Sequence, residues 1–269
     1  GSSPPPRRVG RFRMCLESRR ADLRPLPFHP DRPVPTDPHV PSASSPSPST
    51  RPLVPERGGR LFLAVEGSLL FIGIPAALYL LRESLSHLVI PILIGFGLFC
   101  GALLGVDPGF GRSRFWGALP AWEDVRSVLV RTGAGAGGLT AVLWIATPDL
   151  LLSFPMQRPF IWGALLLGYP LFSVYPQELI FRAFFFHRYR PVLSSPAARV
   201  VASALLFGWA HVLFGNWTAP LLSTTGGFLF AWTYHRTGSL RLVAIEHALW
   251  GGWIFTVGLG RYFYSGALG

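Results

Sequence analysis

The sequence predicts an all-α protein, built as a polytopic bundle of membrane-spanning helices. Three observations lead to this fold class. Half of the 269 residues are hydrophobic and only 14% are charged, whereas an ordinary soluble domain carries about 25% charged residues. Mostly apolar stretches of about 20 residues, the length of a helix that crosses a bilayer, recur along the chain. Arg residues gather in alternate loops between these stretches, as they do when every second loop faces the cytoplasm.

The leader, residues 1–58, is rich in Pro, Ser and Arg and has almost no apolar periodicity. Such a segment buries too little apolar surface to offset its chain entropy, so we predict that it is disordered. The formal net charge is +11, and the residues before Leu61 supply +6 of it. This charge favours an anionic membrane face as partner rather than nucleic acid, because the leader lacks interleaved aromatic residues.

Residues 60–262 form the predicted membrane domain, with seven spans, or eight if the fourth divides. The fourth stretch is too long for one straight span, and we expect a bend or break near Pro170 or Pro176. The Arg-rich alternate loops predict an integral multi-pass protein with a cytoplasmic N-terminus. The spans cover residues 61–81, 88–106, 125–146, 160–189, 197–213, 221–234 and 240–258.

The fourth span carries a carboxylate and a guanidinium in an otherwise apolar stretch. Glu178 and Arg182 are four residues apart, so on a helix they share a face and can pair. Charges at membrane depth cost at least about 2.5–3.5 kcal/mol each and usually mark function. A structural ion pair that locks two helices together explains them equally well. Gln177 points about 100° away from Glu178 on the same helix.

Other polar residues lie in later and earlier spans. His211 is near the end of the fifth span, and His247 follows Glu246 in the seventh. Glu66, in the first span, either pairs with an Arg or reaches toward the membrane surface. A single His on an apolar helix is more often a hydrogen-bonded packing residue than a catalyst. Two His and a Glu–Arg pair, buried together, offer groups to activate water and donors for a developing oxyanion.

The order of these motifs resembles the CPBP intramembrane proteases, the CAAX-processing and bacteriocin-processing (Abi-like) group. Here the motifs are Gln177-Glu178-x-x-x-Arg182, then Phe207-x-x-x-His211, then His247. The family pattern is Glu-Glu-x-x-x-Arg, Phe-x-x-x-His, then His-x-x-x-Asn or a small residue. The resemblance covers residues 160–255. It implies a helical bundle that cleaves membrane-tethered peptides, including prenylated C-terminal Cys motifs.

Two positions depart from the family pattern. Gln177 stands at the first Glu, and an amide cannot act as a general base. Gly251 stands where Asn often closes the last motif, which removes one side-chain donor. The resemblance implies a water-activating pair, an oxyanion donor and two supporting groups. By position, and with Glu178 taken as the surviving base, Glu178 and His211 are the water-activating pair. His247 is the oxyanion donor, and Arg182 and Gln177 are the supporting groups.

Other schemes stay open at this point. No cofactor is favoured, but Glu178, His211 and His247 also fit a zinc site with one coordination position left for water. The His-Glu-x-x-His helix of many metalloproteases is absent from the sequence. A non-catalytic membrane scaffold that lost the first Glu is one alternative function. A small transporter with a Glu178–Arg182 relay is another, although no internal repeat pairs the two halves.

Overall fold

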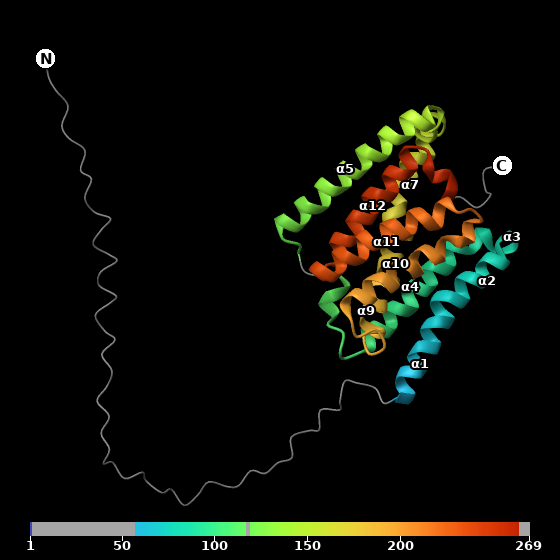
Figure 1. Cartoon of the computed structure of the whole chain (residues 1–269), viewed down its shortest axis with the longest axis vertical. Coiled ribbons are helices and arrows are strands. Elements are labelled where there is room, and N and C mark those ends of the chain that lie inside the picture. Colours follow the sequence, from blue (N-terminus) through green and yellow to red (C-terminus); the bar gives the residue numbers. More distant parts are fainter. Residues whose placement is uncertain (2–56, 117–118, 264–269) are drawn as a thin grey trace, which may run out of the picture. The chain divides into compact units, whose positions relative to one another are not determined.

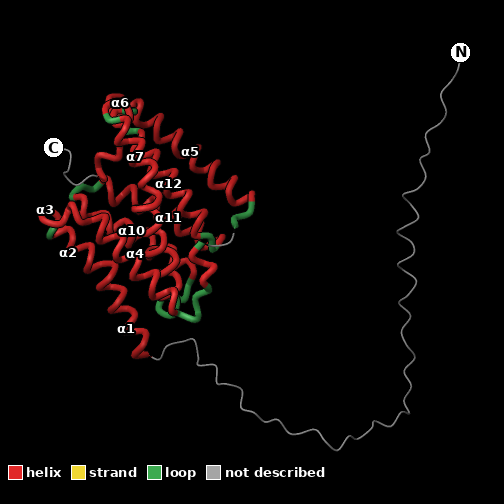
Figure 2. Tube along the Cα trace, turned by 180° about the vertical axis from the view of Figure 1, so that it is seen from behind, coloured by secondary structure: helices red, strands yellow, loops and turns green. Residues whose placement is uncertain are grey.

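The structure, a computed structural model, describes Gly1, residues 57–116 and residues 119–263. Within these residues the regular elements are all helices (Figures 1 and 2). The predicted all-α class is therefore confirmed. The leader predicted to be disordered, residues 1–58, falls almost wholly outside the described residues.

The first half of the described chain contains both long and short helices. A π-helical turn, Leu69–Gly73, joins α1 directly to α2. At one edge of the bundle lie α1 and α2, and α5 runs along the opposite edge (Figure 1). The elements are α1 (Arg57–Ser68), α2 (Ile74–Leu80), α3 (Arg82–Leu85), α4 (Val89–Val106) and α5 (Trp122–Ala146).

The second half contains the stretch that was predicted to bend. Two π-helical segments, Pro170–Val174 and Leu179–Phe184, divide it on either side of the short α8. π-Helical turns of this kind are frequent at functional sites. The elements are α6 (Ser153–Gln157), α7 (Pro159–Tyr169), α8 (Tyr175–Glu178), α9 (Phe185–Arg188), α10 (Pro196–Ala210), α11 (Thr218–Thr237) and α12 (Leu240–Thr256).

Local sequence signals fix where the last three helices begin and end. The Ser195 hydroxyl accepts a hydrogen bond from the Ala198 N–H at the start of α10. The Ser239 hydroxyl does the same for the Leu242 N–H at the start of α12. These caps satisfy backbone donors that a helix leaves unpaired. Gly238, with φ +61°, ends α11 in a left-handed conformation that glycine adopts without strain.

Four helical stretches are long and apolar enough to cross a membrane: 59–80, 82–106, 122–146 and 196–214. Many of their large apolar side chains are exposed on the outer surface of the bundle. Their length and their apolar surface support an integral membrane protein. The total of seven to eight spans and the cytoplasmic N-terminus stay predictions.

Ion pairs join α1 and the end of α4 to α9. Arg188 donates two hydrogen bonds to Glu66, at 3.1 and 2.8 Å, and the Tyr189 hydroxyl donates a third at 3.1 Å. Glu66 therefore pairs with an Arg, one of the two outcomes expected for it. Asp107, in the loop after α4, lies 2.9 Å from the ring of His187. This contact holds the pKa of the Asp107 carboxyl below its usual value.

Close packing of α10 against α11 depends on glycine. A Cβ at Gly208 would overlap the Thr224 hydroxyl and lie 3.0 Å from the carbonyl oxygen of Pro220. A Cβ at Gly227 would lie 3.1 Å from the backbone of Ala204. Small residues let two helix backbones approach this closely inside a membrane. The α10–α11 pair is thus tightly packed beside the polar residues described next.

We expect Gly208→Ala to lower the free energy of unfolding by about 1–3 kcal/mol, the usual cost of overpacking a tight core. Thermal unfolding of the purified protein in detergent measures this loss. Gly137→Ala in α5 is the matched control, since no atom lies within 4 Å of a Cβ there. An equal effect of the two substitutions would contradict the tight α10–α11 contact.

Candidate active site

A fully buried ion pair forms the centre of the site. Arg182 Nε lies 3.0 Å from Glu178 Oε2, and neither side chain is exposed. The guanidinium carbon of Arg182 lies 4.5 Å from the ring centre of Phe207 and 5.5 Å from that of Phe230. Its Nη2 also donates to the Gly227 carbonyl at 3.4 Å. Two charges removed from water need such enclosure and pairing, because their desolvation costs several kcal/mol per ion.

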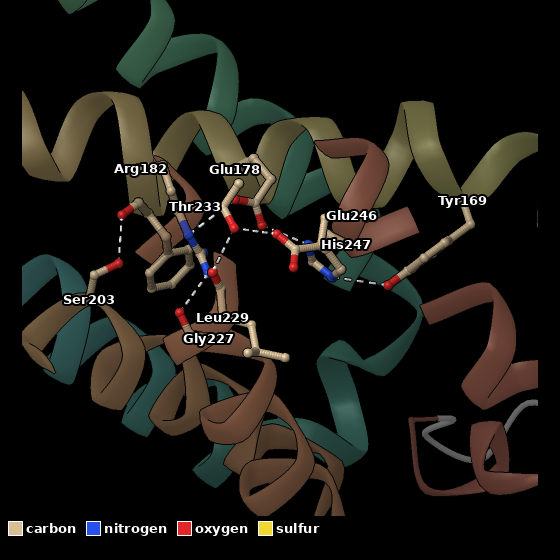
Figure 3. A network of polar contacts seen from close by, with 10 residues as sticks. Tyr169, Glu178, Arg182, Ser203, Gly227, Leu229, Thr233, Glu246 and His247 are labelled. Carbon is tan, nitrogen blue, oxygen red and sulfur yellow. Dashed lines mark hydrogen bonds and ion pairs between the residues drawn. The ribbon is translucent and has the colours of Figure 1, made fainter. Parts of the chain in front are cut away.

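The second oxygen of Glu178 contacts His247 on α12. His247 Nδ1 lies 2.7 Å from Glu178 Oε1, so Nδ1 carries the hydrogen and donates it to the carboxylate. The other ring nitrogen, Nε2, lies 3.1 Å from the hydroxyl of Tyr169 at the end of α7 (Figure 3). Phe230 stacks on the imidazole with a centroid distance of 4.5 Å. Both ring nitrogens of His247 are therefore engaged, and the ring orientation is fixed.

His211 lies where α10 passes into a short 3-10 turn. Its Nδ1 is 2.7 Å from the carbonyl oxygen of Phe207, so Nδ1 must be the donor. In a neutral imidazole the remaining nitrogen is then an acceptor. His211 Nε2 can consequently take a proton from a group in the space beside it.

That space is a cavity of about 600 Å³ with mostly apolar walls. Side chains from α4, α7, α10, α11 and α12 line it. Its polar lining includes Tyr169, Gln177, His211 and His247. A volume of this size falls in the usual range for small-molecule sites in proteins. The cavity therefore brings two imidazoles, a phenol and an amide to one largely apolar space.

Gln177 presents an unused acceptor. Its Nε2 donates to the Ser173 hydroxyl at 2.7 Å, whereas its buried Oε1 has no hydrogen-bond partner among the described residues. A buried polar atom without a partner is costly, so such an atom in a cavity wall indicates a site for a donor group.

Part of the chain matches a known family model. Residues 159–253 match the family model described as Type II CAAX prenyl endopeptidase Rce1-like. Residues 159–253 are therefore similar to the CAAX protease family. No curated protein and no solved structure matches the chain significantly. The family match supports a membrane-embedded protease at the level of the family.

Within the matched segment, the predicted site residues divide into two groups. Glu178 and Arg182 are buried behind the cavity, whereas Gln177 and His211 line it, and His247 joins the two groups. The role of Glu178 as general base stays a prediction, and the geometry does not favour it. Both carboxylate oxygens already face partners, Oε1 the ring of His247 and Oε2 the guanidinium of Arg182.

The residues proposed for zinc do not fit a metal site. No group of three or more His, Cys, Asp or Glu in the described part of the chain is placed to hold a metal ion. Glu178 is held by Arg182 and His247, and both nitrogens of His247 already have partners. A zinc ligand needs a free lone pair directed at the metal. Glu178, His211 and His247 therefore do not supply the three ligands of a zinc site in this geometry.

Sequence reasoning missed two residues that make polar contacts in the bundle, Tyr169 and Arg131. Tyr169 reads as one more aromatic residue of an apolar helix. Arg131 lies inside the predicted third span, and an Arg at that depth is a signal that was available. Its Nη2 lies 2.6 Å from Glu246 Oε1, and it also contacts the Thr233 hydroxyl. Glu246 thus faces α5, away from His247.

We expect Arg182→Met to destabilise the protein by about 3–5 kcal/mol, because it leaves Glu178 buried without its cation. Arg188→Met, which removes the cation of the partly exposed Glu66 pair, is the matched control and should cost about 1 kcal/mol or less. Unfolding midpoints of the two variants in the same detergent give the comparison. Equal losses would show that burial of the Glu178–Arg182 pair carries no special cost.

Proposed function

We propose that the protein is an intramembrane endopeptidase that hydrolyses a peptide bond of a membrane-tethered substrate. The substrate class is a peptide with a prenylated C-terminal Cys motif. One observation carries the proposal: a largely apolar cavity is lined by an imidazole whose acceptor nitrogen has no hydrogen-bond partner among the described residues, beside a buried carboxylate–imidazole network. The family match of residues 159–253 supports the same reaction class.

In the proposed reaction, His211 Nε2 takes a proton from a water molecule as the water oxygen attacks the scissile carbonyl carbon. The carbonyl oxygen becomes an oxyanion in the tetrahedral intermediate, on the His247 side of the cavity. The C–N bond then breaks, and the proton held by His211 passes to the leaving amine. A new carboxylate and a new amino terminus result.

The other predicted residues act around this step. Gln177 Oε1, the unpaired acceptor, accepts the second hydrogen of the water and so directs its lone pair at the carbonyl. Glu178 orients His247 through Nδ1, and Arg182 holds the Glu178 carboxylate in place. This assigns positioning roles to Glu178 and Arg182, and it leaves water activation to His211.

The cavity suits a substrate that carries a lipid chain. Its walls are formed mainly by aliphatic and aromatic side chains of α7, α11 and α12. An isoprenoid chain attached to the substrate Cys gains by leaving water for such a surface, at about 25 cal/mol per Å² of apolar area buried. No cofactor enters this scheme.

We expect His211→Ala to lower kcat at least about 10²-fold, the smaller end of the usual contribution of a general base. The assay uses the full chain in liposomes with a quenched fluorescent peptide that ends in a farnesylated Cys-aliphatic-aliphatic-X motif. His235→Ala is the matched control, since His235 is exposed on α11 and does not line the cavity.

The same assay separates the alternatives. Wild-type protein that binds the farnesylated peptide without cleaving it would support a membrane scaffold and contradict the peptidase. Equal turnover by wild type and the His211→Ala variant would remove His211 from the reaction.

We expect Gln177→Glu to raise kcat, because a carboxylate at this position of the cavity wall can share the water proton with His211. Gln177→Leu, of similar size but without an acceptor, should lower kcat. Turnover of the farnesylated peptide as a function of pH measures both effects. A wild-type rate equal to that of the Gln177→Leu variant would show that the amide does not contact the water.

A further inference from the structure

The hydroxyl of Tyr169 lies between His247 and Gly251. It lies 3.1 Å from His247 Nε2, and Tyr169 lines the same cavity as His211 and Gln177. On its other side is Gly251, one helical turn after His247. A Cβ at position 251 would overlap the Tyr169 hydroxyl and lie 2.6 Å from its Cζ. The side chain missing at Gly251 is therefore replaced in space by a phenol from another helix.

His247 cannot reach an oxyanion in the cavity with either ring nitrogen. Nδ1 faces Glu178 and Nε2 faces Tyr169. The ring itself is stacked on Phe230 and has the edge of Phe207 against it, so it cannot turn without breaking these contacts. Whatever hydrogen bond His247 contributes to the reaction must therefore pass through the group that covers Nε2.

We propose that Tyr169 is a catalytic residue, whose phenolic hydrogen binds the oxyanion of the tetrahedral intermediate. With Nε2 protonated, His247 donates to the phenol oxygen, and the phenol donates its own hydrogen into the cavity. Nδ1 donates to the Glu178 carboxylate, which holds the ring in this orientation. The chain of contacts is Arg182, Glu178, His247 and Tyr169, in that order (Figure 3).

This inference rests on the proposed peptidase function and adds a residue to it. The phenol supplies the donor whose loss the sequence indicated at Gly251. A donor held in place before the reaction stabilises developing charge without reorganisation, and removing one such donor costs about 10²–10³-fold in kcat. The edge-to-face contact of Tyr169 with Phe255, at 5.5 Å, helps to hold the ring in place.

The first test is Tyr169→Phe, which removes the hydroxyl and keeps the ring. We expect kcat on the farnesylated peptide to fall about 10²-fold with KM nearly unchanged, because the lost contact forms only in the transition state. Tyr79→Phe on α2, whose residue does not line the cavity, is the matched control. A Tyr169→Phe variant with wild-type kcat would overturn the inference while leaving the peptidase proposal intact.

The second test exchanges the donor between the two helices. Gly251→Asn alone should lose activity, because its side chain overlaps the Tyr169 ring, and Tyr169→Ala alone should lose it for lack of a donor. The double variant Tyr169→Ala/Gly251→Asn has space for the amide and regains a donor. We expect its kcat to exceed that of either single variant at least tenfold.

The outcomes separate the two proposals. A double variant no better than the single ones, with an unfolding midpoint close to that of wild type, would overturn the donor role. If the double variant does not fold, the kcat and KM of the Tyr169→Phe variant alone decide the matter. A wild-type chain that cleaves no peptide would overturn the peptidase proposal and, with it, any oxyanion for Tyr169 to bind.

Discussion

The packing of the rest of the domain depends on the buried pair of Glu178 and Arg182. Two charges without solvent exposure are tolerable only when their surroundings satisfy them. Here α11 contributes a carbonyl and an aromatic face, α10 contributes the ring of Phe207, and α12 contributes His247. The pair therefore fixes the relative positions of three helices that are distant in sequence. The imidazole of His247 is oriented by the buried Glu178 carboxylate rather than by the cavity.

Two adjacent residues of α8 face different surroundings. Consecutive residues of a helix, here Gln177 and Glu178, differ in direction by about 100°. Glu178 is buried in the core, whereas Gln177 borders the cavity. The arrangement separates an ionised group, which needs enclosure, from an amide, which can meet water and substrate at lower cost.

Much of this organisation could be predicted from the sequence, and the exceptions have physical reasons. Composition gave the fold class, and the spacing of Glu178 and Arg182 gave their pairing, because both depend on local pattern. The contact of Tyr169 with His247 could not be found in this way. It depends on the packing of α7 against α12, and nothing near Tyr169 in the sequence indicates a polar contact. The group that fills the space beside Gly251 could not be predicted for the same reason, since a missing side chain reveals nothing about which distant group lies there.

The attachment of α5 has a consequence for how the protein depends on its membrane. Lipid tails compete equally well for an apolar helix face, so apolar contact alone does not keep one helix against another in a bilayer. Polar contacts hold α5 against α12: Arg131 pairs with Glu246, and the Trp253 indole nitrogen lies 3.2 Å from both the Ala136 carbonyl oxygen and the Thr140 hydroxyl. Acyl chains cannot replace these partners. This side of the domain should therefore keep its shape in membranes of differing thickness and unsaturation.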